Sequence, residues 1–233
     1  MYKRQLIRRE AVLSSKIEGT HTTVDELMQL EAGHEQLFAG DEKRRDDAWE
    51  VMNYVRALER GIGLLGVSGD YPISLNYIKT IHSVLLQGVR GESRSPGNFR
   101  TLQYHIGPST DIDQARFIPP PAQYLMECMN NFELYLNDTG DEDHPLVKLA
   151  LSHYQFETIH PFADGNGRLG RLLITLLLVK WGTLSHPVLH LSDYFEQNRA
   201  MYYDALLSVS QTSSWREWLS FFLNGVAWQA EDT

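Results

Sequence analysis

Apolar side chains recur at the spacing of an α-helix along most of this 233-residue chain, and this periodicity limits the fold more than any other feature. Strand-like patterns occur only at 101–106 and 115–118, inside the Gly-, Ser- and Pro-rich stretch 88–121, and they suggest a hairpin. No series of apolar strands alternates with the helices, which argues against a parallel sheet. We therefore predict an all-α fold with one small β-hairpin.

Turn residues and capping patterns divide the helical sequence into segments. The predicted helices cover residues near 3–18, 23–37, 41–65, 74–85, 122–136, 144–159, 169–181, 193–209 and 214–228. Gly19 is a typical stop for the first of these helices. Thr23 followed by Glu26 predicts a capping box at the second helix, and Ser74 predicts a cap at the fourth.

The length allows one large domain with an appendage, and the hydrophobic fraction of 42% permits a sizeable core. A Gly- and Ser-rich break at 66–70 marks the main boundary. We expect an N-terminal helical region at 1–66, a central unit at 70–210 and a C-terminal helix at 211–233.

The formal net charge of −9 argues against a surface that binds nucleic acid, because such a surface needs a dominant basic field. The single cysteine, Cys128, excludes an internal disulfide and a multi-cysteine zinc site. The longest apolar run, 172–179, is shorter than the roughly 20 residues that cross a bilayer, and no signal peptide is visible. We expect a cytoplasmic protein with neither a nucleic-acid nor a membrane partner.

The segment 160–171 reads His-Pro-Phe-Ala-Asp-Gly-Asn-Gly-Arg-Leu-Gly-Arg and is the most informative part of the sequence. Pro161 disfavours α geometry at His160, so the preceding helix should end there with the imidazole at its terminus. The turn 164–167 then leads into another helix. The first N–H groups of such a helix point toward one spot, which predicts an anion site.

The charged side chains of this segment suit a polyphosphate and a metal ion. Arg168 and Arg171 lie one turn apart and can both bind phosphate oxygens. Asp164 offers a hard oxygen ligand for Mg²⁺, which needs only one or two protein carboxylates beside phosphates. His160 can serve as a general base near neutral pH.

Two other interpretations of the segment are open. Gly165-x-Gly167-x-x-Gly170 also satisfies a dinucleotide-binding fingerprint, but that motif needs a preceding strand, and 146–159 has the pattern of a helix. A plain helical corner with a buried structural histidine is the second alternative. It leaves the combination of base, metal ligand, anion turn and two arginines unexplained.

The segment resembles the signature of the Fic family, His-x-Phe-x-(Asp/Glu)-Gly-Asn-Gly-Arg-x-x-Arg, and meets every fixed position. A looser resemblance extends over about 72–210, which implies the all-α Fic core. The resemblance implies transfer of AMP from ATP, with Mg²⁺, to a Ser, Thr or Tyr hydroxyl of a protein. Relatives often form dimers, so a homodimer is one expected state.

The resemblance also implies roles for single residues. His160 would deprotonate the target hydroxyl and Asp164 would hold Mg²⁺. The implied ATP-binding residues are Gly165, Asn166, Gly167, Arg168, Leu169, Gly170, Arg171, Asn198 and Tyr202. Tyr202 could instead be a core aromatic residue. The predicted hairpin would be the flap that docks the target, with Phe117 and Ile118 as clamp residues.

An inhibitory element is implied near the N-terminus. The sequence from Ser14 to Gly19 resembles the family's inhibitory pattern, (Ser/Thr)-x-x-x-Glu-(Gly/Asn), and Ser14 and Glu18 share a helix face. Glu18 would pair with Arg171 in the place of the γ-phosphate and hold ATP in an unproductive pose.

Two other functions use the same residues. The first is removal of AMP from a modified protein, with Glu18 as the base that activates water, and the sequence does not separate it from AMP transfer. The second is a non-enzymatic adaptor that only binds nucleotide, which an intact His160 and Asp164 argue against. The sequence does not identify the target.

Overall fold

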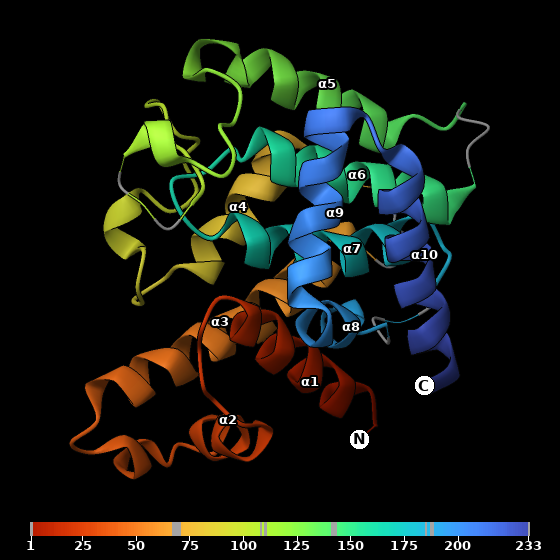
Figure 1. Cartoon of the computed structure of the whole chain (residues 1–233). Coiled ribbons are helices and arrows are strands. Elements are labelled where there is room, and N and C mark those ends of the chain that lie inside the picture. The colour runs from red at the N-terminus through yellow and green to blue at the C-terminus, as the bar shows by residue number, and fades with distance from the viewer. Residues whose placement is uncertain are drawn as a thin grey trace.

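A computed structural model describes residues 2–66, 71–107, 109, 111–140, 144–184, 186 and 189–232. Figure 1 shows a bundle of helices in which the N- and C-terminal ends lie on the same side. The α-helices are α1 (Tyr2–Ile17), α2 (Val24–Glu31), α3 (Glu42–Leu65), α4 (Leu75–Leu85), α5 (Leu125–Asn137), α6 (Pro145–Ile159), α7 (Asn166–Lys180), α8 (Leu191–Gln197), α9 (Arg199–Thr212) and α10 (Trp215–Asp232). Short 3-10 turns are η1 (Glu35–Phe38), η2 (Glu92–Arg94), η3 (Ile112–Gln114) and η4 (Ala122–Tyr124).

Helix α7 lies in the middle of the bundle (Figure 1). Every residue from Leu172 to Leu178 is buried, so the helix has no face for solvent. A helix that is apolar on all sides has to be surrounded by other elements, and α6, α3, α4 and α1 all contact it. The first turn of α7, which carries the predicted anion site, is therefore held on a rigid central element.

Helix α1 packs against α3 and α8 (Figure 1). It buries Leu6, Ile7, Ala11 and Ile17 in the core. The helix ends just before Gly19, whose φ of 94° is in the left-handed region that glycine tolerates. This confirms the predicted first helix and its glycine stop, and it places the Ser14–Glu18 face against the bundle.

The predicted caps are confirmed. Thr23 and Glu26 form the full capping box at α2, and Ser74 caps α4 through its side chain. Asp41 caps α3 in the same way, although we did not predict that cap. The predicted extent of the second helix is wrong, because α2 stops at Glu31, before Gly33 with its φ of 84° and the turn η1.

The predicted β-hairpin is wrong in its strands. Among the described residues of the segment, pairing is limited to one isolated antiparallel bridge between Ile106 and Phe117. The Ile106 N–H donates to the Phe117 carbonyl at 2.8 Å, and Phe117 N–H donates back at 3.1 Å. The turn η3 and the prolines at 119–121, which lack N–H donors, prevent a longer ladder. The described part of this segment is therefore a loop that contains one bridged pair.

The predicted helix at 193–209 is also wrong, because two helices meet at Asn198. Asn198 uses both its backbone N–H and its side-chain amide to donate to the Tyr194 carbonyl, at 3.1 and 2.9 Å. Its own carbonyl accepts from Tyr202 N–H at 2.9 Å. A local side-chain bond of this kind competes with the helical ladder.

None of the described helices has the length and apolar character to cross a membrane. Positions 67–70 of the predicted break lie outside the described residues.

Candidate active site

His160 lies at the point where α6 ends. Its φ of 49° and ψ of 62° turn the chain into the left-handed region, which costs a non-glycine residue about 1–2 kcal/mol. Arg100 supports this corner, because its Nε donates to the His160 carbonyl at 2.9 Å and Pro161 O accepts from Arg100 N–H at 2.9 Å. The turn directs the imidazole toward a cavity instead of along the helix.

The His160 ring is neutral at physiological pH. Burial lowers the pKa of His160 to about 4, and the backbone carbonyl of Glu157 opposes this shift only in part. A neutral imidazole has a lone pair on one ring nitrogen and can accept a proton. The ring is therefore in the protonation state that a general base requires.

The turn after His160 is closed by its own side chains. The Asn166 carboxamide accepts from Phe162 N–H at 2.9 Å and donates to the Phe162 carbonyl at 2.8 Å. Phe162 is fully buried and stacks on His82, with 3.7 Å between ring centroids. His82 bridges α4 to the turn, because its ring nitrogens pair with Asp164 O at 2.9 Å and Gly97 N–H at 2.8 Å. We did not predict this role for His82, which from sequence is one residue on an apolar helix face.

The start of α7 is open to an anion. Gly165 is its N-cap in the left-handed conformation, with φ 76°, and no side chain among the described residues caps this helix. The first N–H groups of a helix have no partner within it, so an uncapped start can donate to an anion. A Cβ on Gly167 would lie 2.4 Å from Glu18 Oε1, so a glycine is needed there for an acidic group to approach.

Asp164 lies beside this helix start with a side-chain exposure of 36%. Its Oδ1 accepts from Gly165 N–H at 2.6 Å and lies 3.7 Å from an Arg168 nitrogen. No group of three or more His, Cys, Asp or Glu that could hold a metal occurs among the described residues. A single accessible carboxylate fits Mg²⁺ that takes its other ligands from phosphates and water.

Arg168 is buried and held by a partner that we did not predict. It forms an ion pair with Glu50 of α3 at 2.8 Å, and Glu50 also pairs with Arg90 at 3.3 Å. Burial raises the pKa of Glu50, while the charges of Arg168 and Arg90 lower it. The pair holds the Arg168 guanidinium 3.7 Å from the Asp164 carboxylate.

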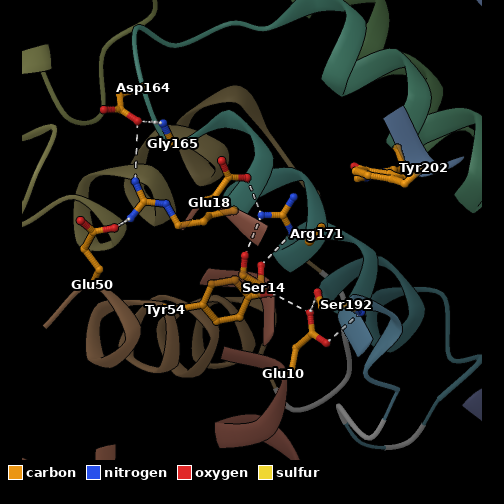
Figure 2. Close-up of polar contacts among 12 residues, drawn as sticks. Glu10, Ser14, Glu18, Glu50, Tyr54, Asp164, Gly165, Arg171, Ser192 and Tyr202 are labelled. Atoms are coloured by element: carbon orange, nitrogen blue, oxygen red, sulfur yellow. Dashed lines mark hydrogen bonds and ion pairs between the residues drawn. The ribbon is translucent and has the colours of Figure 1, made fainter. Parts of the chain in front are cut away.

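Arg171 is buried and is bound by α1. It donates through Nε to Ser14 Oγ and through Nη2 to Ser14 O, both at 2.9 Å. The same Nη2 lies 2.7 Å from Glu18 Oε1 (Figure 2). Burial alone would raise the pKa of Glu18, but the charge and hydrogen bond of Arg171 outweigh it, so the pKa is lowered and Glu18 is ionised. The structure thus brings together the two predicted inhibitory residues and the second arginine of the motif.

His160, Gly167, Arg171 and Glu18 line a cavity of about 160 Å³, whereas Asp164 and Arg168 are not among its lining residues. Its polar wall includes Glu18, His160 and Arg171, and its apolar wall includes Phe117, Tyr202 and Leu206. Glu157, which we also did not predict, lines the same space, and its Oε1 is buried without a hydrogen-bond partner among the described residues. Burial raises the pKa of Glu157 to about 7.

Of the remaining predicted nucleotide-binding residues, Tyr202 lines this cavity, whereas Leu169, Gly170 and Asn198 do not. Leu169 is fully buried in the core, and Gly170 provides space for Glu157, since a Cβ there would lie 2.3 Å from Glu157 Oε1. Tyr202 is buried, lines the cavity and pairs with His153 at 2.8 Å. Asn198 holds the α8–α9 junction as described above.

The two predicted clamp residues differ in exposure. Phe117 lines the cavity and carries the single bridge, whereas Ile118 is 52% exposed and lines an adjoining groove.

Comparison with known proteins places this arrangement in a family. The sequence profile described as Fic/DOC family matches residues 72–178, and the one described as Fic/DOC family N-terminal matches residues 1–63. The chain belongs to the Fic/DOC family. The two matched ranges contain the segment from His160 to Arg171 and the helix with Ser14 and Glu18.

Distant relatives of this Fic chain carry the name protein adenylyltransferase. The Fic protein of Aedes aegypti is 33% identical over 181 residues, which are 77% of this chain and 33% of that protein. That of Drosophila mojavensis is 33% identical over 191 residues, or 82% of this chain and 34% of that protein. The chain thus spans about a third of the length of these curated relatives.

Solved structures share the architecture. A Fic family protein from Desulfovibrio desulfuricans G20 superposes with a TM-score of 0.79 at 25% identity, over 98% of this chain and 65% of that one. Fic-1 from C. elegans gives a TM-score of 0.75 at 25% identity, over 96% and 61% of the two chains. The all-α arrangement described above is therefore the Fic-type helical fold.

Proposed function

We propose that this chain transfers AMP from ATP to a hydroxyl group of a protein, and that Glu18 holds it inactive. The observation that carries the proposal is the ion pair of Glu18 with Arg171 at the uncapped start of α7. A carboxylate occupies the place where the helix start and a buried arginine would otherwise receive a phosphate. The names of the relatives support the same activity.

In the proposed reaction the target oxygen attacks the α-phosphorus of ATP. The neutral His160 ring takes the proton of the hydroxyl, a phosphorus–oxygen bond to the AMP moiety forms, and the bond to the leaving pyrophosphate breaks. The N–H groups of the first turn of α7 hold the phosphate oxygens, and Arg171 balances the charge at the far end. The reaction depends on alignment, since positioning is worth as much as about 7–11 kcal/mol.

Asp164 would hold the metal ion of this reaction. Mg²⁺ neutralises charge on neighbouring phosphates when bound. The Asp164 carboxylate is accessible and stands beside the N–H groups of the helix start, which suits a ligand shared between the protein and the phosphates. Arg168, held by Glu50, keeps positive charge on the other side of this carboxylate.

Inhibition would act on the pose of the nucleotide. The Glu18 carboxylate lies over Gly167 and neutralises Arg171, so a triphosphate cannot place its last phosphate there. The phosphate chain is then forced into another path, and the α-phosphorus is not in line with the incoming hydroxyl. The protein can bind ATP in this state and still turn over slowly.

Substitutions of the inhibitory residue Glu18 and of the base His160 test the proposal. We expect Glu18→Gly to raise incorporation of label from α-³²P-ATP into the enzyme or into lysate proteins by at least tenfold. His160→Ala in that background should remove the label, since the base is lost. Equal incorporation by the wild-type protein and the Glu18→Gly variant would refute the inhibitory role.

Removal of AMP from a modified protein is a second candidate. It is favoured by the ionised state of Glu18 and by its position in the same cavity as His160. Glu18 would take a proton from the water that attacks the phosphorus. An AMP-modified target separates the two activities, because Glu18→Gly would then abolish release of AMP instead of raising its transfer.

A further inference from the structure

A second carboxylate anchors the inhibitory helix inside the protein. Glu10 lies on α1 two turns before Glu18, on the same face, and is 4% exposed. Its Oε1 accepts from Tyr54 OH of α3 at 3.2 Å and, in a shorter contact, from Ser192 Oγ of α8. Its Oε2 accepts from Ser192 N–H at 3.3 Å. Figure 2 shows Glu10 between these two elements.

The surroundings of Glu10 provide hydrogen bonds but no charged group in direct contact with it among the described residues. Its donors on α3 and α8 are a phenol, a hydroxyl and a backbone N–H, all uncharged. Asp193, the next residue on α8, is paired with Arg9. From α7, Arg171 acts on Glu10 only through its field. An ionised Glu10 is therefore stabilised only by neutral hydrogen-bond donors and by the field of Arg171, at a cost in desolvation.

Glu10 is linked to the switch by a short relay. Tyr54 donates to Glu10, and although burial raises the pKa of Tyr54, the nearby Ser14 side chain lowers it. Ser14 in turn accepts two hydrogen bonds from Arg171, the partner of Glu18. A change at Glu10 therefore alters how α1 packs at the turn that carries Ser14 and Glu18.

We infer that Glu10 is a positioning residue for the inhibitory helix, which seats α1 when its carboxyl is neutral and loosens it when the carboxyl ionises. This inference rests on the proposed inhibition by Glu18 and adds its regulation. Higher pH would open the helix and free Arg171 for a nucleotide phosphate.

The direction of the effect follows from linkage. Burial raises the pKa of Glu10 to about 7, and the hydrogen bonds from Ser192 and the field of Arg171 offset this only in part. In a released helix the carboxyl would have its ordinary pKa of about 4.3. The Glu10 carboxyl therefore binds its proton more tightly in the docked helix than in the released helix. Docking of α1 is strongest below pH 4 and weakens as pH rises to about 7. Between pH 6 and pH 8 the released fraction should grow about tenfold.

The experiment compares wild type with Glu10→Gln, which has the shape of the neutral acid and does not titrate. Hydrogen exchange of the α1 amides is measured in both proteins at pH 6 and pH 8, and the ratio between the two proteins cancels the intrinsic pH dependence. We expect that ratio to change about tenfold, with faster exchange in wild type at pH 8. The matched control is Glu59→Gln, which changes an exposed acid that pairs with Arg4 of α1. Its α1 amides should exchange at the same rate as those of wild type at each pH.

Transfer of AMP provides the second measurement. The rate of AMP transfer by wild type, relative to that of Glu18→Gly, should rise with pH. Glu10→Gln should lower this relative rate and remove most of its pH dependence. In the Glu18→Gly background, Glu10→Gln should have no effect. Equal exchange ratios at the two pH values would overturn the role of Glu10. Absence of transfer in Glu18→Gly would overturn the proposed function while the exchange measurement still reports on docking.

Tyr54→Phe guards against a folding defect in Glu10→Gln. It removes one donor and the relay to Ser14 but preserves the ring. We expect faster α1 exchange at both pH values with the pH dependence retained. Unchanged exchange in this variant would also contradict the relay.

Discussion

At the scale of single residues, buried histidines keep the site in one protonation state. His153 of α6 is 3% exposed, lies among aromatic rings and pairs through Nε2 with the Tyr202 hydroxyl at 2.8 Å. Burial lowers the pKa of His153 to about 3, and the positive charge of Arg171 lowers it further. The ring therefore stays neutral beside the arginine that the switch controls.

His153 should make the protein sensitive to acid. A folded pKa below the unfolded value of about 6.5 means that stability is fully present above that value and is lost as pH falls. Between pH 7 and pH 5 the loss from this group should be about 2 kcal/mol. Urea unfolding of His153→Gln should show a pH dependence that is smaller by this amount, and His21→Gln, at an exposed position, should not. The same dependence in wild type and His153→Gln would contradict the assignment.

At the scale of elements, close contact between α3 and α7 holds the site together. Gly61 of α3 lies so close to its neighbours that an added Cβ would be 2.7 Å from Leu176 Cδ1 of α7 and 2.9 Å from Tyr77 OH of α4. This approach also brings Glu50 of α3 to Arg168 of α7. The glycine is retained in a helix interior because helix packing outweighs its poor helix propensity.

Two alanine substitutions in α3 should therefore have opposite effects. Gly61→Ala should lower the free energy of unfolding by about 1–3 kcal/mol, because the methyl group overpacks the interface. Gly63→Ala should raise it by about 0.5–1 kcal/mol, because no atom lies within 4 Å of the added Cβ and alanine favours a helix. Urea unfolding of the two variants checks the contrast, and equal effects would show that the α3–α7 contact is looser than described.

At the scale of the whole molecule, one hydrophobic core spans the chain. Ile7 of α1, Leu58 of α3, Leu173 of α7 and Phe222 of α10 belong to the same buried cluster. The three segments predicted along the sequence thus contribute to a common core, and α1 has two tasks, since it supplies both core packing and the inhibitory carboxylate.

Removal of α1 should therefore differ from mutation of Glu18. Deleting residues 1–18 removes four buried apolar side chains and uncovers the faces of α3 and α8 against which α1 packs. The loss should cost several kcal/mol, at about 1.5–3 kcal/mol for each large side chain. The melting temperature should fall clearly, whereas Glu18→Gly, which changes a half-buried group at the helix end, should leave it within a few degrees. A deletion variant as stable as wild type would show that α1 is only a switch.

Local spacing and caps between near neighbours are enough to predict the helical class, most helix starts and the segment from His160 to Arg171. Prediction from sequence failed where a local side-chain bond or a long-range contact competes with periodicity, as at Asn198 and at the single bridge between Ile106 and Phe117. The partners of the motif become visible only in the folded protein: Glu50 for Arg168, His82 for the turn, and Glu10 for the inhibitory helix. These residues lie far from the motif along the chain, and no local pattern records that burial in one core brings them to it.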